Sequence, residues 1–279
     1  YMPNVNIGSK IHFENMLKES VLAEKLGYAT VSIPEHHLIN LLMMPSPLQM
    51  AVKIASITKK INITTGIVVL PIHDMRTYAG EVTTADILTD GRLILGVGRG
   101  AFPWEMGRLG TPIETSKEKF VESLEVLQLL LKDKEVSYQG KFYNFESITI
   151  MPRPISNPVQ MMVAAMNLES IKDAASRGFH VQSTVLSGNK ELLLSRVNAF
   201  KEGCEILGEK GKLLTEHLEV SVNFYDNKPI SIDLPNQVSC KIETTDAALK
   251  GQTVSSTYKP AILNNGLSIH CLLYTSPSP

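Results

Sequence analysis

The sequence has few cysteines, almost no net charge and no long apolar run, and each absence excludes a class of protein. Cys204, Cys240 and Cys271 are odd in number, are far apart, and include no C-x-x-C. Neither a disulfide framework nor a zinc site is therefore indicated. The formal net charge of −1 gives no attraction to nucleic acid or anionic lipid. No apolar run reaches the roughly 18 residues that span a bilayer. The reducing cytoplasm is the expected location, without nucleic-acid or membrane partners.

The composition is that of a globular protein with a sizeable core. Of 279 residues, 43% are hydrophobic and 20% are charged, which are ordinary proportions for a soluble domain. A single α/β barrel often reaches about 250 residues. Length alone is compatible with one large domain or two small ones.

Short apolar runs alternate with longer amphipathic ones, the pattern of βα units around a parallel sheet. Strands are predicted at 28–33, 61–70, 92–97, 159–165, 179–184 and 218–224. Helices are predicted at 13–26, 47–57, 78–88, 115–132, 168–177 and 190–207. A Gly/Pro-broken loop at 98–112 and a hairpin at 137–150 complete the pattern. A doubly wound sheet fits the same order as a barrel, so the pattern leaves both architectures open.

The alternation stops after Asp226. Residues 227–279 show little periodicity and are predicted to be irregular, and residues 271–279 resemble translated adapter DNA rather than native protein. Residues 1–10 contain no strand ahead of the first helix. We therefore expect one barrel domain at 1–226 that lacks its first strand and its last βα units, with a gap beside the strand at 28–33.

Two histidines follow the first predicted strand, in Pro34-Glu35-His36-His37. Neighbours in extended chain point in opposite directions, so at most one of them faces the mouth of a barrel. The alternative interpretation is a pair of solvated loop histidines. A metal site requires a third ligand, and no H-E-x-x-H spacing is present. No metal is predicted.

A glycine-rich segment, Gly96-Val97-Gly98-Arg99-Gly100-Ala101, follows the third predicted strand. It matches G-x-G-x-x-A, but that motif opens directly into a helix, whereas Pro103 and further glycines follow here. Glycines that admit a ligand beside a guanidinium fit an anchor for a mononucleotide phosphate better. A tight turn with a solvated Arg99 is the alternative.

A third segment, residues 164–170, turns a buried strand into a helix. Asn167 is a suitable N-cap, the free N–H groups of a helix start favour a phosphate, and Ser170 could add a hydroxyl. An ordinary capped helix explains this segment equally well.

The order and spacing of these motifs resemble the luciferase-like flavin-dependent monooxygenases. The resemblance covers about residues 11–224 and rests on 34–37, 65–74, 88–100 and 163–170, with 140–143 and 151–154 in support. It implies a TIM-type (β/α)₈ barrel, here incomplete. It also implies an oxidoreductase acting on paired donors, in which reduced FMN from a flavin reductase and O₂ oxygenate a small substrate such as an aldehyde. Members are often dimers, so a homodimer of the complete protein is expected.

The resemblance also assigns residues. His36 matches the catalytic histidine, proposed to act in proton transfer, and Gly66-Ile67 matches a non-prolyl cis peptide beneath the flavin ring. The remaining matches are cofactor contacts: Gly98 beside the flavin, Arg99 and Ser170 at the phosphate, and Gly100, Ala101, Phe102, Ala165, Met166 and Thr184 around them.

Two departures from the family pattern matter. Met166 stands where many members have a phosphate-binding serine, which leaves only its backbone N–H. The missing strands would leave unpaired sheet edges. The resemblance therefore predicts activity for the complete protein. It does not predict whether this chain is active. Two alternatives remain: a deazaflavin-dependent dehydrogenase on the same barrel, and a flavin-binding barrel without catalysis. Glu35-His36-His37 favours the oxygenase.

Overall fold

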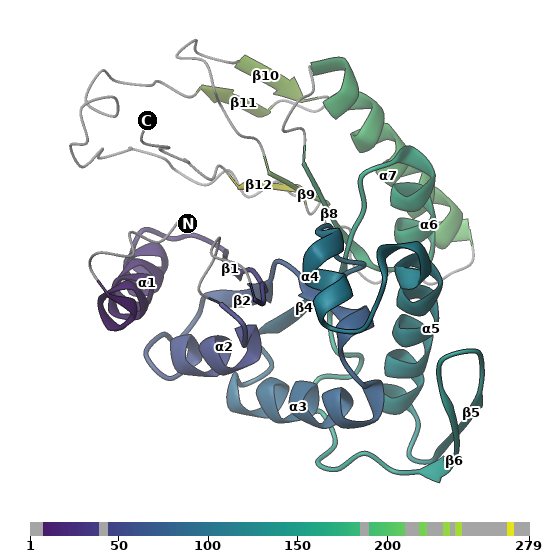
Figure 1. The fold of residues 1–279 in the computed structure, drawn as a ribbon. Coiled ribbons are helices and arrows are strands. Elements are labelled where there is room, and N and C mark those ends of the chain that lie inside the picture. The colour runs from purple at the N-terminus through teal and green to yellow at the C-terminus, as the bar shows by residue number, and fades with distance from the viewer. Residues whose placement is uncertain are drawn as a thin grey trace. The chain divides into compact units, whose positions relative to one another are not determined.

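Strands and helices alternate along most of the chain (Figure 1), as the hydrophobic pattern predicts. This computed structural model describes residues 8–38, 44–184, 190–209, 218–221, 231–234, 238–241 and 267–270. The chain divides into two units, Tyr1–Ala164 and Ala165–Pro279. No helix in the described part of the chain is long and apolar enough to cross a bilayer.

The first unit contains a parallel sheet in the order β1-β2-β4-β7. Its strands are β1 (Thr30–Ile33), β2 (Asn62–Thr65), β3 (Val68–Val69), β4 (Leu93–Gly98) and β7 (Met161–Ala164), and β3 pairs with the end of β4. Among the described residues, no strand pairs with the other edge of β1. The sequence predicts a gap at this edge.

Helices cover the sheet of the first unit. They are α1 (Ser9–Lys25), α2 (Pro47–Ala55), the 3₁₀ helix η2 (Leu70–Ile72), α3 (Met75–Leu88), α4 (Pro103–Arg108) and α5 (Ile113–Lys132). α2 and α3 lie side by side along the strands, and α5 packs on α3 (Figure 1). Ile54, Ile63, Leu93, Leu95 and Leu127, from these helices and strands, are fully buried, and burial of such apolar side chains stabilises the packing.

Two charged side chains fix the loops at the amino-terminal side of β4. The Arg92 guanidinium donates to the carbonyl oxygens of Ala55, Thr58, Ile61 and Thr89. The fully buried Asp86 carboxylate accepts the backbone N–H groups of Ile155 and Ser156 and the Ser156 hydroxyl, at 2.5–2.9 Å. Asp86 thereby holds the chain just before β7, after the excursion through α5 and the hairpin of β5 (Val136–Gln139) and β6 (Asn144–Ile148).

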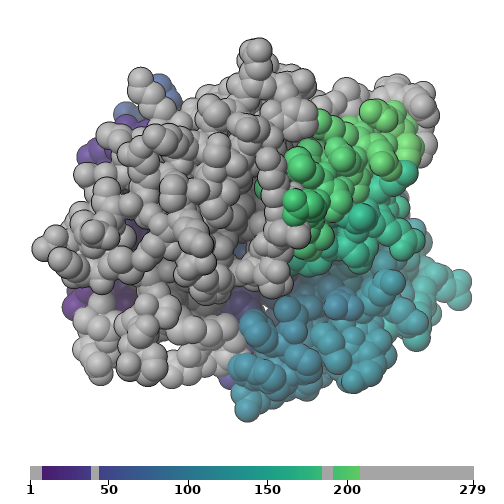
Figure 2. Space-filling model, turned by 90° about the horizontal axis from the view of Figure 1, so that it is seen from above, coloured from purple at the N-terminus to yellow at the C-terminus, as the bar shows by residue number. Residues whose placement is uncertain are grey.

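The second unit contains α6 (Leu168–Ser176), β8 (His180–Thr184), α7 (Lys190–Glu209) and β9 (Leu218–Ser221), and then β10 (Ser231–Leu234), β11 (Val238–Lys241) and β12 (Leu267–His270). β9 lies between β8 and β12, parallel to both, and β10 and β11 form an antiparallel pair. α7 packs on α6, and its outer side forms part of the exposed surface (Figure 2).

The structure corrects the sequence prediction in three places. The strand predicted at 61–70 is interrupted at Gly66-Ile67, and it forms β2, β3 and the start of η2. The loop predicted at 98–112 contains α4, a helix of six residues that is too short to show a 3.6-residue period. The segment 227–279, predicted to be irregular, contains three strands of four residues each, which are too short for a clear alternation.

Candidate active site

Three neighbouring strands of the first unit end at the same edge of the sheet. Glu35, His36 and His37 follow β1, Gly66-Ile67 follows β2, and Arg99 to Phe102 follow β4. In parallel α/β folds this edge is where functional sites form, because strands that run in the same direction bring their loops together there.

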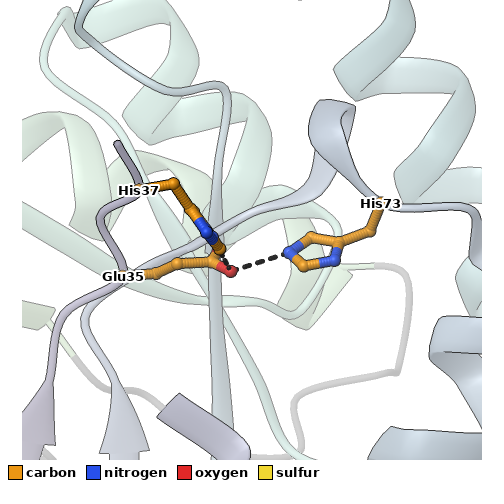
Figure 3. Close-up of side chains that lie close together, drawn as sticks. All are labelled: Glu35, His37 and His73. Atoms are coloured by element: carbon orange, nitrogen blue, oxygen red, sulfur yellow. Dashed lines mark hydrogen bonds and ion pairs between the residues drawn. The ribbon is translucent and has the colours of Figure 1, made fainter. Parts of the chain in front are cut away.

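Two histidines converge on the carboxylate of Glu35 (Figure 3). His37 Nε2 lies 2.9 Å and His73 Nε2 lies 2.8 Å from Glu35 Oε1, and the Val69 N–H donates to Oε2 at 2.6 Å. Glu35 is only 2% exposed. His73 follows η2, and its ring stacks on that of Tyr78 in α3. The buried carboxylate therefore connects the loop after β1 to the segment after β3.

These contacts set the charge of the cluster. Burial by itself raises the pKa of Glu35, but the hydrogen bonds from His37, His73 and Val69 outweigh it and lower the pKa to about 2. The hydrogen bond to Glu35 raises the pKa of His37, against the opposing effect of burial. Glu35 is therefore an anion at neutral pH, stabilised by three N–H donors.

Glu35, His37 and His73 are also of the residue types that bind metal ions, and their ligand atoms lie within 4.8 Å of one another. A zinc ion with bonds of about 2.0–2.2 Å in tetrahedral geometry would hold its ligand atoms about 3.3 Å apart. The two nitrogen–oxygen distances of 2.8 and 2.9 Å are shorter and match hydrogen bonds. We interpret the cluster as a carboxylate that accepts two imidazole N–H groups.

His36 lies apart from this cluster. Its ring lies against Phe102, with centroids 5.2 Å apart, and its Nδ1 is 3.2 Å from Oε2 of Glu105 in α4. The other oxygen of Glu105 accepts the backbone N–H of His37. His36 therefore contacts residues of the segment after β4, whereas the ring of His37 contacts Glu35.

The end of β4 is packed tightly against the end of β2 and the segment that follows β2. The peptide bond between Gly66 and Ile67 is cis, at the position where the resemblance places one. A Cβ on Gly98 would collide with the Ile67 side chain, and a Cβ on Gly96 would collide with the carbonyl oxygen of Thr65. At Gly96 only glycine fits, because the collision is with a backbone atom, whereas a Cβ on Gly98 would require the Ile67 side chain to shift.

The segment after β4 exposes a cation. Arg99 and Ala101 are exposed, and Gly100 has a φ of 87°, which favours glycine. Within the described residues, no hydrogen bond or ion pair engages the Arg99 guanidinium. A free guanidinium beside glycines is suited to bind an anionic group.

The other predicted cofactor residues lie in the second unit. Ala165 is buried, whereas Met166 and Ser170 are exposed at the start of α6. The Asn167 side chain caps this helix by accepting the Ser170 N–H at 2.8 Å, as its N-cap prediction requires. Thr184 ends β8, and its side chain lies outside the described part of the structure. The roles of all four at a cofactor remain predictions.

Sequence reasoning missed Glu105 and His73. Glu105 lies in the segment predicted to be a loop, where a carboxylate is ordinarily solvated, and it is 68 residues beyond His37. His73 lies 38 residues beyond Glu35. Pro103, a residue favoured in the first turn of helices, was the local signal for α4.

Comparison with known proteins shows which protein family the chain matches. Residues 3–203 match the family model described as luciferase-like monooxygenase. The oxygenase component of the flavin-dependent trigonelline monooxygenase from Acinetobacter baylyi is 29% identical over 196 residues, which are 69% of this chain and 54% of that protein. The chain thus spans little more than half the length of this relative.

Solved structures share the fold. Monooxygenase RslO1 from Streptomyces bottropensis aligns with a TM-score of 0.70 and 26% identity, over 77% of this chain and 65% of that one. The oxygenating constituent of 3,6-diketocamphane monooxygenase from Pseudomonas putida, solved with FMN, has a TM-score of 0.67 and 19% identity, over 77% and 62% of the chains. An F420-dependent secondary alcohol dehydrogenase has a TM-score of 0.64 and 21% identity, over 76% and 65%. The barrel architecture is therefore established and the doubly wound alternative is excluded.

The carboxyl-terminal part resembles a different protein. Residues 238–274 match the family model of the elongation factor P C-terminal domain. Elongation factor P from Pelagibacter ubique is 66% identical over 65 residues, which are 23% of this chain and 35% of that protein. The sequence-predicted boundary after residue 226 lies between the two family matches, and the second match includes residues 271–274, which were expected to be foreign.

Proposed function

The chain belongs to the luciferase-like monooxygenase family, and on that premise we propose that it is the oxygenase part of a two-component enzyme. In this proposal, reduced FMN is delivered by a separate flavin reductase, and O₂ is used to oxygenate a small organic substrate. The trigonelline enzyme, a relative, is named as a flavin-dependent oxygenase component. An aldehyde is the substrate class that the sequence resemblance suggests.

One observation carries the proposal: three adjacent strand ends supply three different functions. His36 follows β1, the Gly66-Ile67 peptide follows β2 and Arg99 follows β4. An imidazole can move a proton, a flat peptide surface can support an isoalloxazine ring, and a guanidinium can hold a phosphate.

The residues of the first unit fit an FMN. Reduced FMN would supply the electrons and the position at which O₂ is activated. Arg99 offers an exposed cation with no partner in the described residues, and Gly98 keeps the space beside Ile67 free of a side chain. We assign the phosphate to Arg99 and the flavin-ring contacts to Gly66, Ile67, Gly98 and Phe102. In this assignment the imidazole of His36 is the proton-transfer group, and it lies near the ring of Phe102.

The second candidate is a dehydrogenase that uses the deazaflavin F420, because an F420-dependent alcohol dehydrogenase has the same fold. Such an enzyme transfers a hydride and needs no O₂. Glu105 contacts the ring of His36, and Glu35 contacts the ring of His37. Carboxylates beside the imidazoles favour proton transfer by histidine in an oxygenase and in a dehydrogenase alike. The cofactor therefore distinguishes the two functions.

The experiment is a pair of fluorescence titrations of the full chain, with FMN and with F420, followed by oxygen consumption with NADH and a flavin reductase. We expect saturable FMN binding, weaker F420 binding, and O₂ uptake that increases on addition of an aldehyde. Tight F420 binding with no oxygen uptake would establish the dehydrogenase instead. FMN binding without substrate-stimulated uptake would leave a flavin-binding barrel.

We further propose that the luciferase-like part ends between residues 204 and 237 and that the remainder is a separate segment. The two family matches, 3–203 and 238–274, do not overlap. The flavin function belongs to the first of them.

A further inference from the structure

The carboxylate of Glu105 is placed to determine which nitrogen of His36 carries a proton. Glu105 is 1% exposed, so its oxygens require partners within the protein. Both have one: Oε1 accepts the backbone N–H of His37, and Oε2 lies 3.2 Å from His36 Nδ1. The His36 side chain is 18% exposed, so its ring is held at one edge and partly accessible.

A carboxylate that is ionised can only accept hydrogen bonds. The contact with Oε2 therefore requires a hydrogen on His36 Nδ1. A neutral imidazole carries one N–H, so Nε2 has a free lone pair, and the hydrogen bond at one nitrogen sets the state of the other.

We propose that Glu105 is a positioning residue that fixes His36 in the Nδ1–H tautomer, so that Nε2 acts as the proton acceptor in the reaction. In this step an O–H bond of the bound reactant breaks, an Nε2–H bond forms, and the electron pair stays on the oxygen. The proposal rests on the proposed function, because it assigns His36 the role of base there.

Glu35 does not share this role. Its oxygens are taken by His37, His73 and Val69, and its contacts with the two histidines involve their Nε2 atoms. Glu35 therefore serves as a matched control: it is a second buried glutamate in contact with histidine, but its partners do not include the His36 ring.

The substitution Glu105→Gln gives a sharp prediction. The His37 N–H needs an oxygen acceptor, so the glutamine oxygen would remain there and its NH₂ group would face His36 Nδ1. A donor at this place requires Nδ1 to accept, which moves the hydrogen of His36 to Nε2. The variant inverts the tautomer with almost no change in side-chain shape.

The test is two-dimensional NMR of the ¹⁵N-histidine-labelled full chain, without flavin, at pH 8, with His36 assigned by loss of its signals in His36→Gln. We expect Nδ1–H in the wild type and in Glu35→Gln, and Nε2–H in Glu105→Gln. An Nε2–H wild type, or an unchanged tautomer in Glu105→Gln, would overturn the proposal. The wild-type spectrum decides by itself should Glu105→Gln fail to fold.

A kinetic measurement then tests whether product formation requires the Nδ1–H tautomer of His36. We expect Glu105→Gln to keep its affinity for FMN and to lose product formation by about 10²–10⁴-fold, the usual effect of a misplaced acid or base. Unchanged product formation in this variant would refute the role of Nε2 as base. A wild type with the Nδ1–H tautomer but no oxygenase activity would refute the proposed function and leave the positioning of His36 intact.

Discussion

Substitution of Arg99 tests cofactor binding without removing a contact that supports the fold. Its guanidinium is exposed and has no partner among the described residues, so its removal disrupts no internal contact there. We expect Arg99→Ala to weaken FMN binding by about 1.5–3 kcal/mol, the range for a hydrogen bond to a charged group.

Riboflavin, which lacks the phosphate, is the control ligand for Arg99→Ala. Its affinity should change little, and the stability of the variant should equal that of the wild type. Fluorescence titration of both ligands measures this difference. Equal losses for FMN and riboflavin would show that Arg99 does not bind the phosphate.

Glu35 predicts a pH dependence of stability. Its pKa is lowered from 4.5 to about 2 in the folded chain, so its stabilising effect is complete above pH 4.5 and is lost as the pH falls towards 2. We expect the wild type to lose about 2 kcal/mol more than Glu35→Gln between pH 5.5 and pH 3. Urea unfolding at both values measures this. Parallel losses in the two proteins would contradict the ionised cluster.

Candidate site residues were predictable only where their position after a predicted strand indicated them. His36 and Arg99 could be assigned because they follow strands, and strand ends are visible in the hydrophobic pattern. Glu105 and His73 could not, because their partners lie 68 and 38 residues away along the chain and nothing local indicates that a distant N–H will point at them.

At the scale of elements, the pairing of β4 with β2 requires that their backbones approach closely at Gly96 and Thr65. A Cβ at Gly96 would collide with the Thr65 carbonyl oxygen of β2, and this backbone atom cannot rotate away. We expect Gly96→Ala to destabilise the chain by about 1–3 kcal/mol, the usual cost of overpacking, measured by thermal or urea unfolding.

Gly107 provides the matched control for Gly96. It lies in α4, and a Cβ there would meet nothing within 4 Å. We expect Gly107→Ala to stabilise the chain by about 0.5–1 kcal/mol, because alanine loses less backbone entropy than glycine in a helix. Similar effects at both positions would show that the packing of β4 on β2 is not tight.

Most strands and helices were predictable because their periods persist. α5 and α7 each run for 20 residues, long enough for the 3.6-residue period to stand out. β2 and β3 were predicted as one strand, since the β-branched residues continue through Ile67 and a backbone turn at Gly66 leaves no mark in the hydrophobic pattern.

At the scale of the whole chain, two family matches predict two independent parts. A chain ending at residue 226 keeps the entire luciferase-like match and lacks the elongation factor P match. We expect this shortened chain to bind FMN within about threefold of the full-length affinity, which is less than 1 kcal/mol. Titration of both chains measures this.

A loss of FMN binding in the shortened chain would show that residues 227–279 contribute to the flavin-binding part. The pairing of β12 with β9 makes this a demanding test, because β12 is among the residues removed. The barrel itself was predictable from the resemblance, whereas the second match was not, since three strands of four residues carry no period.

The hydrogen bonds of Asp86 to Ile155 and Ser156 have a consequence for how much inserted sequence this chain can tolerate. Because the chain is secured at its re-entry into the sheet, the segment between β4 and β7 can lengthen or shorten while β7 keeps its register beside β4. Loop-closure entropy grows only slowly with length, so insertions near the β5–β6 hairpin should be tolerated. New segments can therefore be grafted into this excursion while the order of the strands in the sheet is kept.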